Sequence, residues 1–146
     1  LVGMPGDRIQ VIDGVLQING EPVKREAAGT WAPDDRGFPV PVFRETLPNG
    51  VSYDTLDLNP RAKGDTTQVF EVPPGHYFFM GDNRDNSLDS RWAPEDPFDP
   101  GVGYVPFENL VGPAKIIFFS VASDAHPLAF WRWPSDMRWA RLFKIP

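Results

Sequence analysis

Proline and glycine limit this chain most, because they recur so often that long helices have little room to form. The 146 residues include 17 prolines and 13 glycines. Proline removes a backbone N–H and clashes inside a helix, while glycine weakens helices and favours turns. Hydrophobic residues still make up 41% of the chain, which is enough for a packed core. The sequence therefore predicts one globular domain built mainly from short β-strands and loops.

Several segments between these interruptions have the composition of strands. Residues 9–23 contain two β-prone runs around Asp13-Gly14, and Asn19-Gly20 follows six residues later. Such dipeptides suit two-residue turns, in which the backbone φ angle is positive. This pattern predicts a three-stranded meander over 9–23. Further strands are expected at 40–45, at 51–56, at 76–80 after a turn over 73–75, and at 114–120.

Composition excludes several classes of function. The chain has no cysteine, which excludes disulfides, thiolate zinc sites and a cysteine nucleophile. It has only two histidines, His76 and His126, so a histidine-rich metal site is not expected. The net charge of −6 argues against nucleic-acid binding. No stretch reaches the roughly 18 apolar residues of a membrane span. We expect neither a metal nor another cofactor.

The polar loop over residues 81–91, GDNRDNSLDSR, concentrates chemistry in eleven residues. Its charged residues are Asp82, Arg84, Asp85, Asp89 and Arg91. The loop directly follows the apolar run 76–80, and a polar loop against an apolar wall is a place where pKa values can be tuned. A solvated turn, a structural ion-pair network and a calcium loop are the alternatives.

The calcium alternative fails on both ways of counting the loop. When Asp82 is taken as the first position, Arg84 stands where a ligand oxygen is needed. When Asn83 is taken as the first position, Leu88 replaces the turn glycine and Pro94 replaces the closing glutamate. The loop is therefore not expected to bind calcium.

All eleven residues of this loop are similar to the last signature box of bacterial type I signal peptidases, peptidase family S26. Gly3-Met4-Pro5-Gly6-Asp7 resembles the end of the preceding box, which in the family reads lysine-arginine, two apolar residues, then glycine-x-proline-glycine-aspartate. The resemblance spans about residues 1–120. It implies a mainly β, antiparallel fold with an incomplete catalytic core.

The expected core comprises residues 1–9 and 69–146, and the expected inserted subdomain, rich in β-hairpins, comprises residues 10–68. A short helix is expected at 136–143, with Ser135 as its cap.

The resemblance also implies a membrane-associated serine endopeptidase that removes signal peptides from exported preproteins. The family uses a serine nucleophile and a lysine general base, and apolar burial makes such a lysine usable by lowering its pKa. The lysine is expected two positions before Leu1, and the serine and a membrane anchor are expected further upstream. The chain by itself is therefore expected to be inactive. The expected location is the outer, periplasmic face of the bacterial inner membrane.

The resemblance assigns roles within the loop as well. Ser87 is expected to orient the lysine, and an Asp89–Arg91 ion pair is expected to hold the loop's shape. Asp82 is expected to pair with the arginine that follows the lysine. Four residues are expected to contact substrate: Phe79, Met80 and Leu88 in the pocket for the small residue before the cleavage site, and Gly81 by close approach of the substrate backbone. For Phe79 and Met80, ordinary core packing is the alternative.

The C-terminal tail combines aromatic and basic residues. Residues 127–146 contain Trp131, Trp133 and Trp139, and their four basic residues, Arg138 and Arg141 among them, outnumber a single aspartate. Tryptophan favours the lipid headgroup zone, and cations favour anionic lipid. The tail is therefore expected to rest on a membrane surface, unless its aromatic residues pack against the sheet.

Two rival functions stay open at this point. The first is a specialised peptidase of the same family that acts on pilin or conjugation precursors. The second is a catalytically silent β domain that binds peptide or membrane. A lysine two positions upstream of Leu1 would favour a peptidase over a silent domain.

Overall fold

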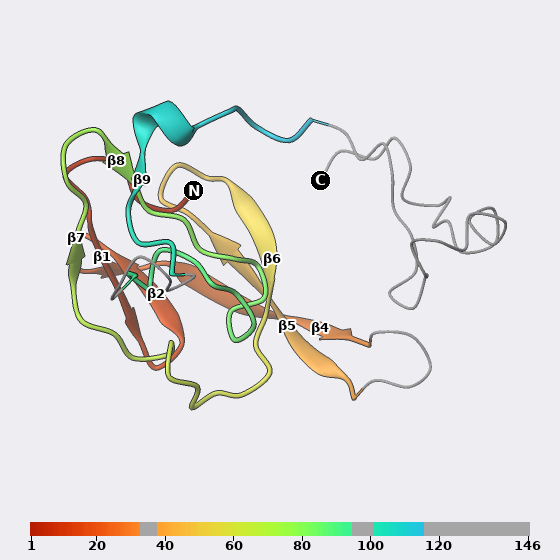
Figure 1. Cartoon of the computed structure of the whole chain (residues 1–146). Helices are drawn as coiled ribbons and strands as arrows, with labels where there is room; N and C mark the ends of the chain where they lie inside the picture. Colours follow the sequence, from red (N-terminus) through yellow and green to blue (C-terminus); the bar gives the residue numbers. More distant parts are fainter. Residues whose placement is uncertain (33–37, 95–100, 116–146) are drawn as a thin grey trace, which may run out of the picture. The chain divides into compact units, whose positions relative to one another are not determined.

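The computed structural model describes residues 1–32, 38–94 and 101–115, and this part of the chain is mainly β, as predicted (Figure 1). The chain forms two units, Leu1–Leu110 and Val111–Pro146, and all the described strands belong to the first unit. The strands are β1 (Arg8–Ile12), β2 (Val15–Ile18), β3 (Glu21–Pro22), β4 (Lys24–Trp31), β5 (Val40–Thr46), β6 (Ser52–Leu56), β7 (Phe70–Glu71), β8 (His76–Tyr77) and β9 (Val105–Pro106). A single turn of 3-10 helix, η2 (Phe107–Asn109), follows β9.

The first sheet is antiparallel, with the strand order β3-β2-β1-β7. Both predicted turns form. Asp13 and Asn19 have φ angles of 47° and 57°, and the glycines that follow them have φ angles of 76° and 86°. These conformations match the right-handed twist of the flanking strands. The predicted meander over 9–23 is therefore confirmed.

The hydrophobic core lies against this sheet. Ile9 and Val11 point inward from β1, and Leu16 does so from β2, as the two-residue period of a strand requires. Phe78 is fully buried, and its ring centroid lies 5.0 Å from that of Phe70. Other core residues are Val23 and Val72, with Val2, Ile18, Leu47, Met80 and Tyr104 partly buried against them.

The start of the chain runs antiparallel beside Phe78. The Val2 and Gly3 N–H groups both donate to the Phe78 carbonyl, at 2.9 and 3.1 Å, and the Phe78 N–H donates to the Gly3 carbonyl at 3.0 Å. A Cβ atom at Gly3 would lie 2.9 Å from the Phe78 Cβ and 2.8 Å from the Ile9 side chain. Only glycine allows this close approach.

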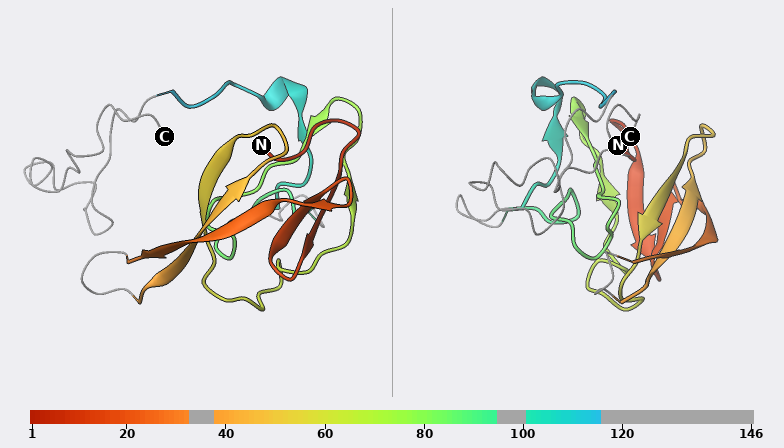
Figure 2. Two further views of the ribbon diagram at one scale, coloured as in Figure 1. Left: turned by 180° about the vertical axis from the view of Figure 1, so that it is seen from behind. Right: turned by 90° about the vertical axis from the view of Figure 1, so that its right-hand side faces the viewer.

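The second sheet has the order β4-β5-β6, and β4 and β5 form a long twisted hairpin (Figure 2). Strands β5 and β6 confirm the strands predicted at 40–45 and 51–56. The end of β6 also pairs with the polar loop, through a parallel bridge between Leu56 and Asn83. This bridge connects the second sheet to the loop that carries the signature residues.

The strand predicted over 76–80 is shorter than expected. It ends at Tyr77, where β8 pairs with β9, because at Phe78 the chain changes partner and pairs with Gly3. The turn before it is confirmed, with the His76 N–H donating to the Pro73 carbonyl.

Several other predictions fall largely outside the described residues. Residues 114–115 have no regular structure, and the rest of the strand predicted at 114–120 lies outside the described residues, as do the helix at 136–143 and the tail tryptophans. The division into a core and an inserted subdomain stays a prediction, although β1 crosses its first boundary. Among the described residues, no helix combines the length and apolar character needed to cross a bilayer.

Candidate functional site

A buried ion pair holds the loop at 81–91 in shape. The Arg91 Nε and Nη2 atoms donate to the two carboxylate oxygens of Asp89, each at 2.9 Å, and both side chains are at most 5% exposed. The Gly81 N–H donates to the same carboxylate at 2.9 Å and so ties the start of the loop to its end. The predicted Asp89–Arg91 pair is therefore present and buried.

These contacts change the acidity of Asp89. Burial by itself raises the pKa of the carboxyl, since it disfavours the charged form. The hydrogen bonds from Arg91 and Gly81, together with the Arg91 charge, outweigh burial and hold the Asp89 pKa below its ordinary value. The Asp89 carboxylate is therefore ionised at neutral pH.

Arg91 also joins the loop to two other parts of the chain. Its Nη2 donates to the Arg84 carbonyl at 2.5 Å, and its Nη1 reaches the Gly64 carbonyl at 3.5 Å. A Cβ atom at Gly64 would lie 2.7 Å from the Arg91 Nη1, so a side chain there would displace the guanidinium. Arg91 thus fixes the middle of the loop as well as its end.

Ser87 packs directly on Gly81. A Cβ atom at Gly81 would lie 2.1 Å from the Ser87 Oγ and 2.4 Å from its Cβ, so the serine side chain occupies that space. The Ser87 carbonyl accepts a hydrogen bond from the Trp92 indole at 3.1 Å. Within the described part of the chain, the half-buried Ser87 hydroxyl has no hydrogen-bond partner. Gly81 is therefore required by an internal contact, whatever its role towards substrate.

The remaining predicted residues lie around this cluster. Phe79 is half-buried, and its backbone pairs with Ser90, whose N–H donates to the Phe79 carbonyl and whose hydroxyl accepts from the Phe79 N–H. Met80 packs against the core, and Leu88 is 61% exposed. Asp82 is exposed, and its carboxylate accepts only from the Asn83 N–H among the described residues. The structure thus groups Gly81, Ser87, Asp89 and Arg91, while Phe79, Met80, Leu88 and Asp82 lie outside that group.

Sequence reasoning missed a buried ionic network that joins this loop to the second sheet. Arg84 Nη2 donates to Glu45 Oε2 at 2.6 Å, and these side chains are 6% and 1% exposed. Tyr53 donates to the same oxygen at 3.1 Å. Arg25 lies 3.9 Å from the other Glu45 oxygen and pairs with Asp57 at 2.6 Å.

The alignment of the three strands contained a signal for this network. Arg25, Glu45 and Tyr53 are direct cross-strand neighbours on β4, β5 and β6. Arg25 also lies 3.6 Å above the Phe43 ring. Burial, reinforced by the nearby Glu45 charge, raises the pKa of Tyr53 to about 12, so its hydroxyl stays a proton donor. A polar row facing inward across three strands would have indicated the network, had the strand pairing been known.

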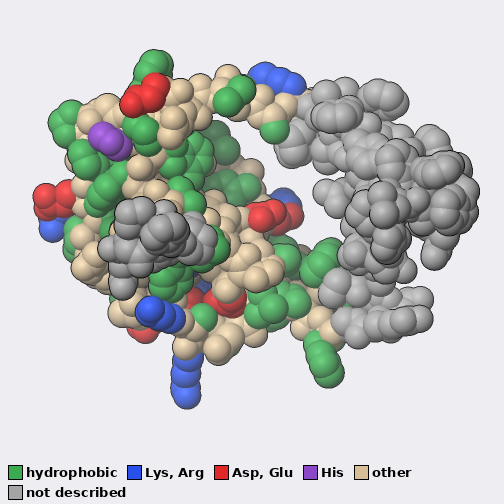
Figure 3. Space-filling view, viewed as in Figure 1, with side chains coloured by type: hydrophobic (Ala, Val, Ile, Leu, Met, Phe, Trp, Pro, Cys, Tyr) green, Lys and Arg blue, Asp and Glu red, His purple; other side chains and the backbone are tan. Residues whose placement is uncertain are grey.

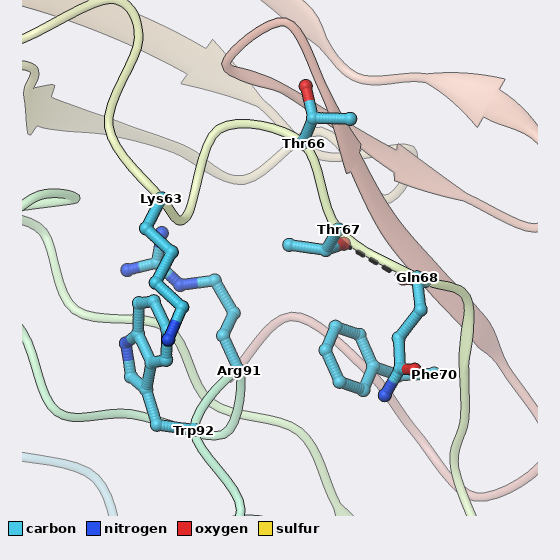
Figure 4. A pocket seen from close by; sticks show the side chains of 7 residues that line it. All are labelled: Lys63, Thr66, Thr67, Gln68, Phe70, Arg91 and Trp92. Atoms are coloured by element: carbon cyan, nitrogen blue, oxygen red, sulfur yellow. Dashed lines mark hydrogen bonds between the residues drawn. The ribbon is translucent and has the colours of Figure 1, made fainter.

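Two neighbouring hollows lie on another face of the loop. The first, of about 220 Å³, is lined by Lys63, Thr66, Thr67, Gln68, Phe70, Arg91 and Trp92 (Figure 4). Its Lys63 ammonium lies 5.3 Å above the Trp92 ring. The second, of about 380 Å³, shares Gln68 and Phe70 and reaches Tyr104.

Neither of these hollows is lined by Gly81 or Ser87, so they are separate from the Ser87 hydroxyl.

The outer surface near the site is partly apolar, and Figure 3 shows apolar side chains gathered over β8 and β9. Among the described residues, no group of three or more histidine, aspartate or glutamate side chains is arranged to hold a metal ion.

Comparison with known proteins gives consistent results. The family described as "Signal peptidase, peptidase S26" matches residues 1–119. Proteins named Signal peptidase I from Rickettsia typhi and Rickettsia akari are each 44% identical over 126 residues, and that from Rickettsia canadensis is 42% identical. Each alignment covers 82% of this chain and 44% of the relative, so the chain spans less than half the length of these relatives. No solved structure matches the chain.

Proposed function

This chain belongs to the signal peptidase family, peptidase S26, and from that premise we propose that it forms the supporting part of a Ser/Lys peptidase active site. The serine nucleophile and the lysine general base come from the polypeptide upstream of Leu1. The complete enzyme removes signal peptides from exported preproteins at the outer face of the bacterial inner membrane.

The Ser87 hydroxyl is the observation that carries this proposal. It is held against Gly81 and has no hydrogen-bond partner in the described part of the chain. A hydroxyl fixed in place and left unpaired is suited to bind a group that another segment supplies. The proposed partner is the amine of the upstream lysine.

The strand register supports this placement of the lysine. Gly3 pairs with Phe78 in antiparallel fashion, and the Val2 and Gly3 N–H groups both donate to the Phe78 carbonyl, so these two residues lie opposite one, as in a β-bulge. Beyond the bulge, each step back along the N-terminal segment moves one step forward from Phe78. Continued upstream, this register sets the residue before Leu1 opposite Met80 and the residue before that, the proposed lysine, opposite Gly81, which Ser87 contacts.

The chemistry follows from the environment of that lysine. An ammonium cannot accept a proton, but apolar surroundings favour the neutral amine and lower its pKa. The Ser87 oxygen accepts an N–H of the amine, and this directs the amine's lone pair towards the nucleophilic serine. The Asp89–Arg91 pair keeps Ser87 in position by holding both ends of the loop.

Asp82 is proposed to pair with the arginine that follows the lysine. The continued register sets that arginine opposite Met80, and residues two apart on a strand share a face, so the arginine lies on the same face as the exposed Asp82 carboxylate. No cation among the described residues forms an ion pair with Asp82. This pair would fix the direction in which the upstream segment enters the site.

The substrate and membrane contacts complete the proposal. Phe79, Met80 and Leu88 contact the small residue before the cleavage site, and the substrate binds as an extended strand. Leu88 is suited to this role because it is 61% exposed. Residues 127–146 bind the lipid surface through their three tryptophans and their excess of basic residues.

The test compares this chain with a longer polypeptide that extends upstream to include the proposed serine and lysine. The substrate is a peptide with small residues before the cleavage site. We expect cleavage by the longer polypeptide only, and its loss when the upstream lysine becomes alanine. Ser87→Ala should lower kcat but leave residual activity, since the base remains but is poorly oriented.

Two outcomes would contradict the proposal. One is specific cleavage by the 146-residue chain that is abolished by mutating one of its own serines. The other is covalent labelling of Ser87 by a serine-directed inhibitor.

A further inference from the structure

Arg84 contacts both halves of the active-site loop. Its Nε donates to the Gly81 carbonyl at 3.2 Å, and its own carbonyl accepts a hydrogen bond from Arg91. Its backbone N–H donates to the Leu56 carbonyl at the end of β6, at 3.0 Å. A shift of Arg84 would therefore move Gly81, on which Ser87 packs, and would also move a partner of Arg91.

Glu45 decides where the Arg84 guanidinium can lie. Arg84 is buried, and Glu45 is the carboxylate that pairs with it among the described residues, at 2.6 Å. A buried guanidinium without a counter-ion is strongly disfavoured, so it would leave this position if the Glu45 charge were lost.

Glu45 is held through one of its two carboxylate oxygens. The Tyr53 hydroxyl donates to the oxygen that Arg84 also contacts, whereas Arg25 approaches the other oxygen at 3.9 Å without a hydrogen bond. Arg25, Glu45 and Tyr53 occupy neighbouring positions of one sheet, so the sheet sets where the carboxylate lies. The Arg84 contact is therefore set by the sheet rather than by the loop.

We propose that Glu45 is a positioning residue of the active-site loop, which sets the location of Gly81 and of the Ser87 hydroxyl through Arg84. This inference rests on the proposed function of the loop. It gives the sheet β4-β5-β6 a role in the reaction, because Glu45 on β5 holds Arg84 of the loop in place. The neighbouring ion pair Arg44–Asp54 lies one residue away on the same two strands and is exposed, and among the described residues its side chains bond to each other and form no hydrogen bond with the loop.

The first arm measures steady-state cleavage by the longer polypeptide. Glu45→Gln should lower kcat by about 10- to 100-fold, with KM changed by less than about 2-fold, because the loop would be displaced while the substrate pocket remains. The matched control replaces the exposed pair, Arg44→Gln with Asp54→Asn, and should keep kcat within about 2-fold. The single variant Arg84→Met and the double variant Arg84→Met with Glu45→Gln should show the same reduction in kcat, since Glu45 acts on the loop through Arg84.

The second arm measures the loop directly in the 146-residue chain, by nuclear magnetic resonance of 15N-labelled protein. The amide signals of Gly81 and Ser87 should shift in Glu45→Gln and stay in place in the control. If Glu45→Gln does not fold, Tyr53→Phe replaces it in both arms. This milder change removes only the hydroxyl that donates to Glu45, and it should lower kcat by about 3-fold and shift the same signals.

The two arms separate the failure of this inference from the failure of the proposed function. If the longer polypeptide does not cleave the peptide at all, the proposed function fails. The amide signals of Gly81 and Ser87 then decide by themselves whether Glu45 positions the loop. Shifted signals would support the positioning role, and unchanged signals in a folded variant would overturn it. If the wild type cleaves and a folded Glu45 or Tyr53 variant keeps full kcat, the function stands and this inference is overturned.

Discussion

Replacing Asp89 with asparagine would remove one charge from the buried pair and leave the other in place. Arg91 would keep its hydrogen bonds to the Arg84 and Gly64 carbonyls but lose the carboxylate that neutralises it. Breaking one partner of a buried ion pair costs about 3–5 kcal/mol. We expect Asp89→Asn to lower the free energy of unfolding by about 3 kcal/mol, the lower end of this range, because the Arg91 guanidinium keeps its hydrogen bonds to the two carbonyls. That is a large share of the roughly 5–15 kcal/mol that stabilises a typical domain.

Equilibrium unfolding in urea, followed by far-ultraviolet circular dichroism at pH 7, measures this loss. The matched control is Asp54→Asn, which breaks an exposed ion pair whose side chains are 48% and 57% exposed. Exposed pairs contribute little to stability, so the control should unfold at nearly the same urea concentration as the wild type. Both variants change one carboxylate to an amide, so the difference between them reports burial.

An Asp89→Asn loss below about 1 kcal/mol, or one equal to that of the control, would refute the reasoning. It would mean that the loop relaxes and lets water reach the guanidinium. The pair would then not hold the loop's ends together, and the route by which Ser87 is positioned would have to lie elsewhere.

Three further predictions test other parts of the site. Gly81→Ala should destabilise the fold by about 1–3 kcal/mol, measured by urea unfolding, because its methyl group would meet Ser87; a stability equal to wild type would count against this contact. The depressed Asp89 pKa stabilises the fold at pH values above the unfolded value of about 3.9, and this stability is lost as the pH falls through the lower folded value. Unfolding midpoints should therefore drop less between pH 7 and pH 3 in Asp89→Asn than in wild type, and equal drops would contradict this. The chain should float with anionic liposomes at low salt, and recovery that is unchanged after all three tryptophans of residues 127–146 are replaced would contradict a membrane role for the tail.

Features encoded in neighbouring residues were predictable from the sequence. The turns at Asp13-Gly14 and Asn19-Gly20 form because these residues tolerate positive φ, which is a property of the dipeptides themselves. The Asp89–Arg91 pair was expected from the resemblance of the loop to the family signature, and its members are only two residues apart. The eleven-residue motif is contiguous, so it identified the family without knowledge of the fold.

Features that depend on which strands become neighbours were not predictable. Glu45 and Arg84 are 39 residues apart, and nothing local to either residue indicates the other. The strand expected over 76–80 ended early because Phe78 turned to Gly3, a partner at the far end of the chain.

The two-residue period of a strand tells which side chains share a face, but not which strand lies alongside. The pairing of strands depends on how the whole core closes, and so only the tertiary structure showed that Glu45 on β5 forms an ion pair with Arg84 of the signature loop. It also showed why Gly81 must be glycine, because the atom that excludes a side chain there belongs to Ser87, six residues further along a loop that folds back on itself.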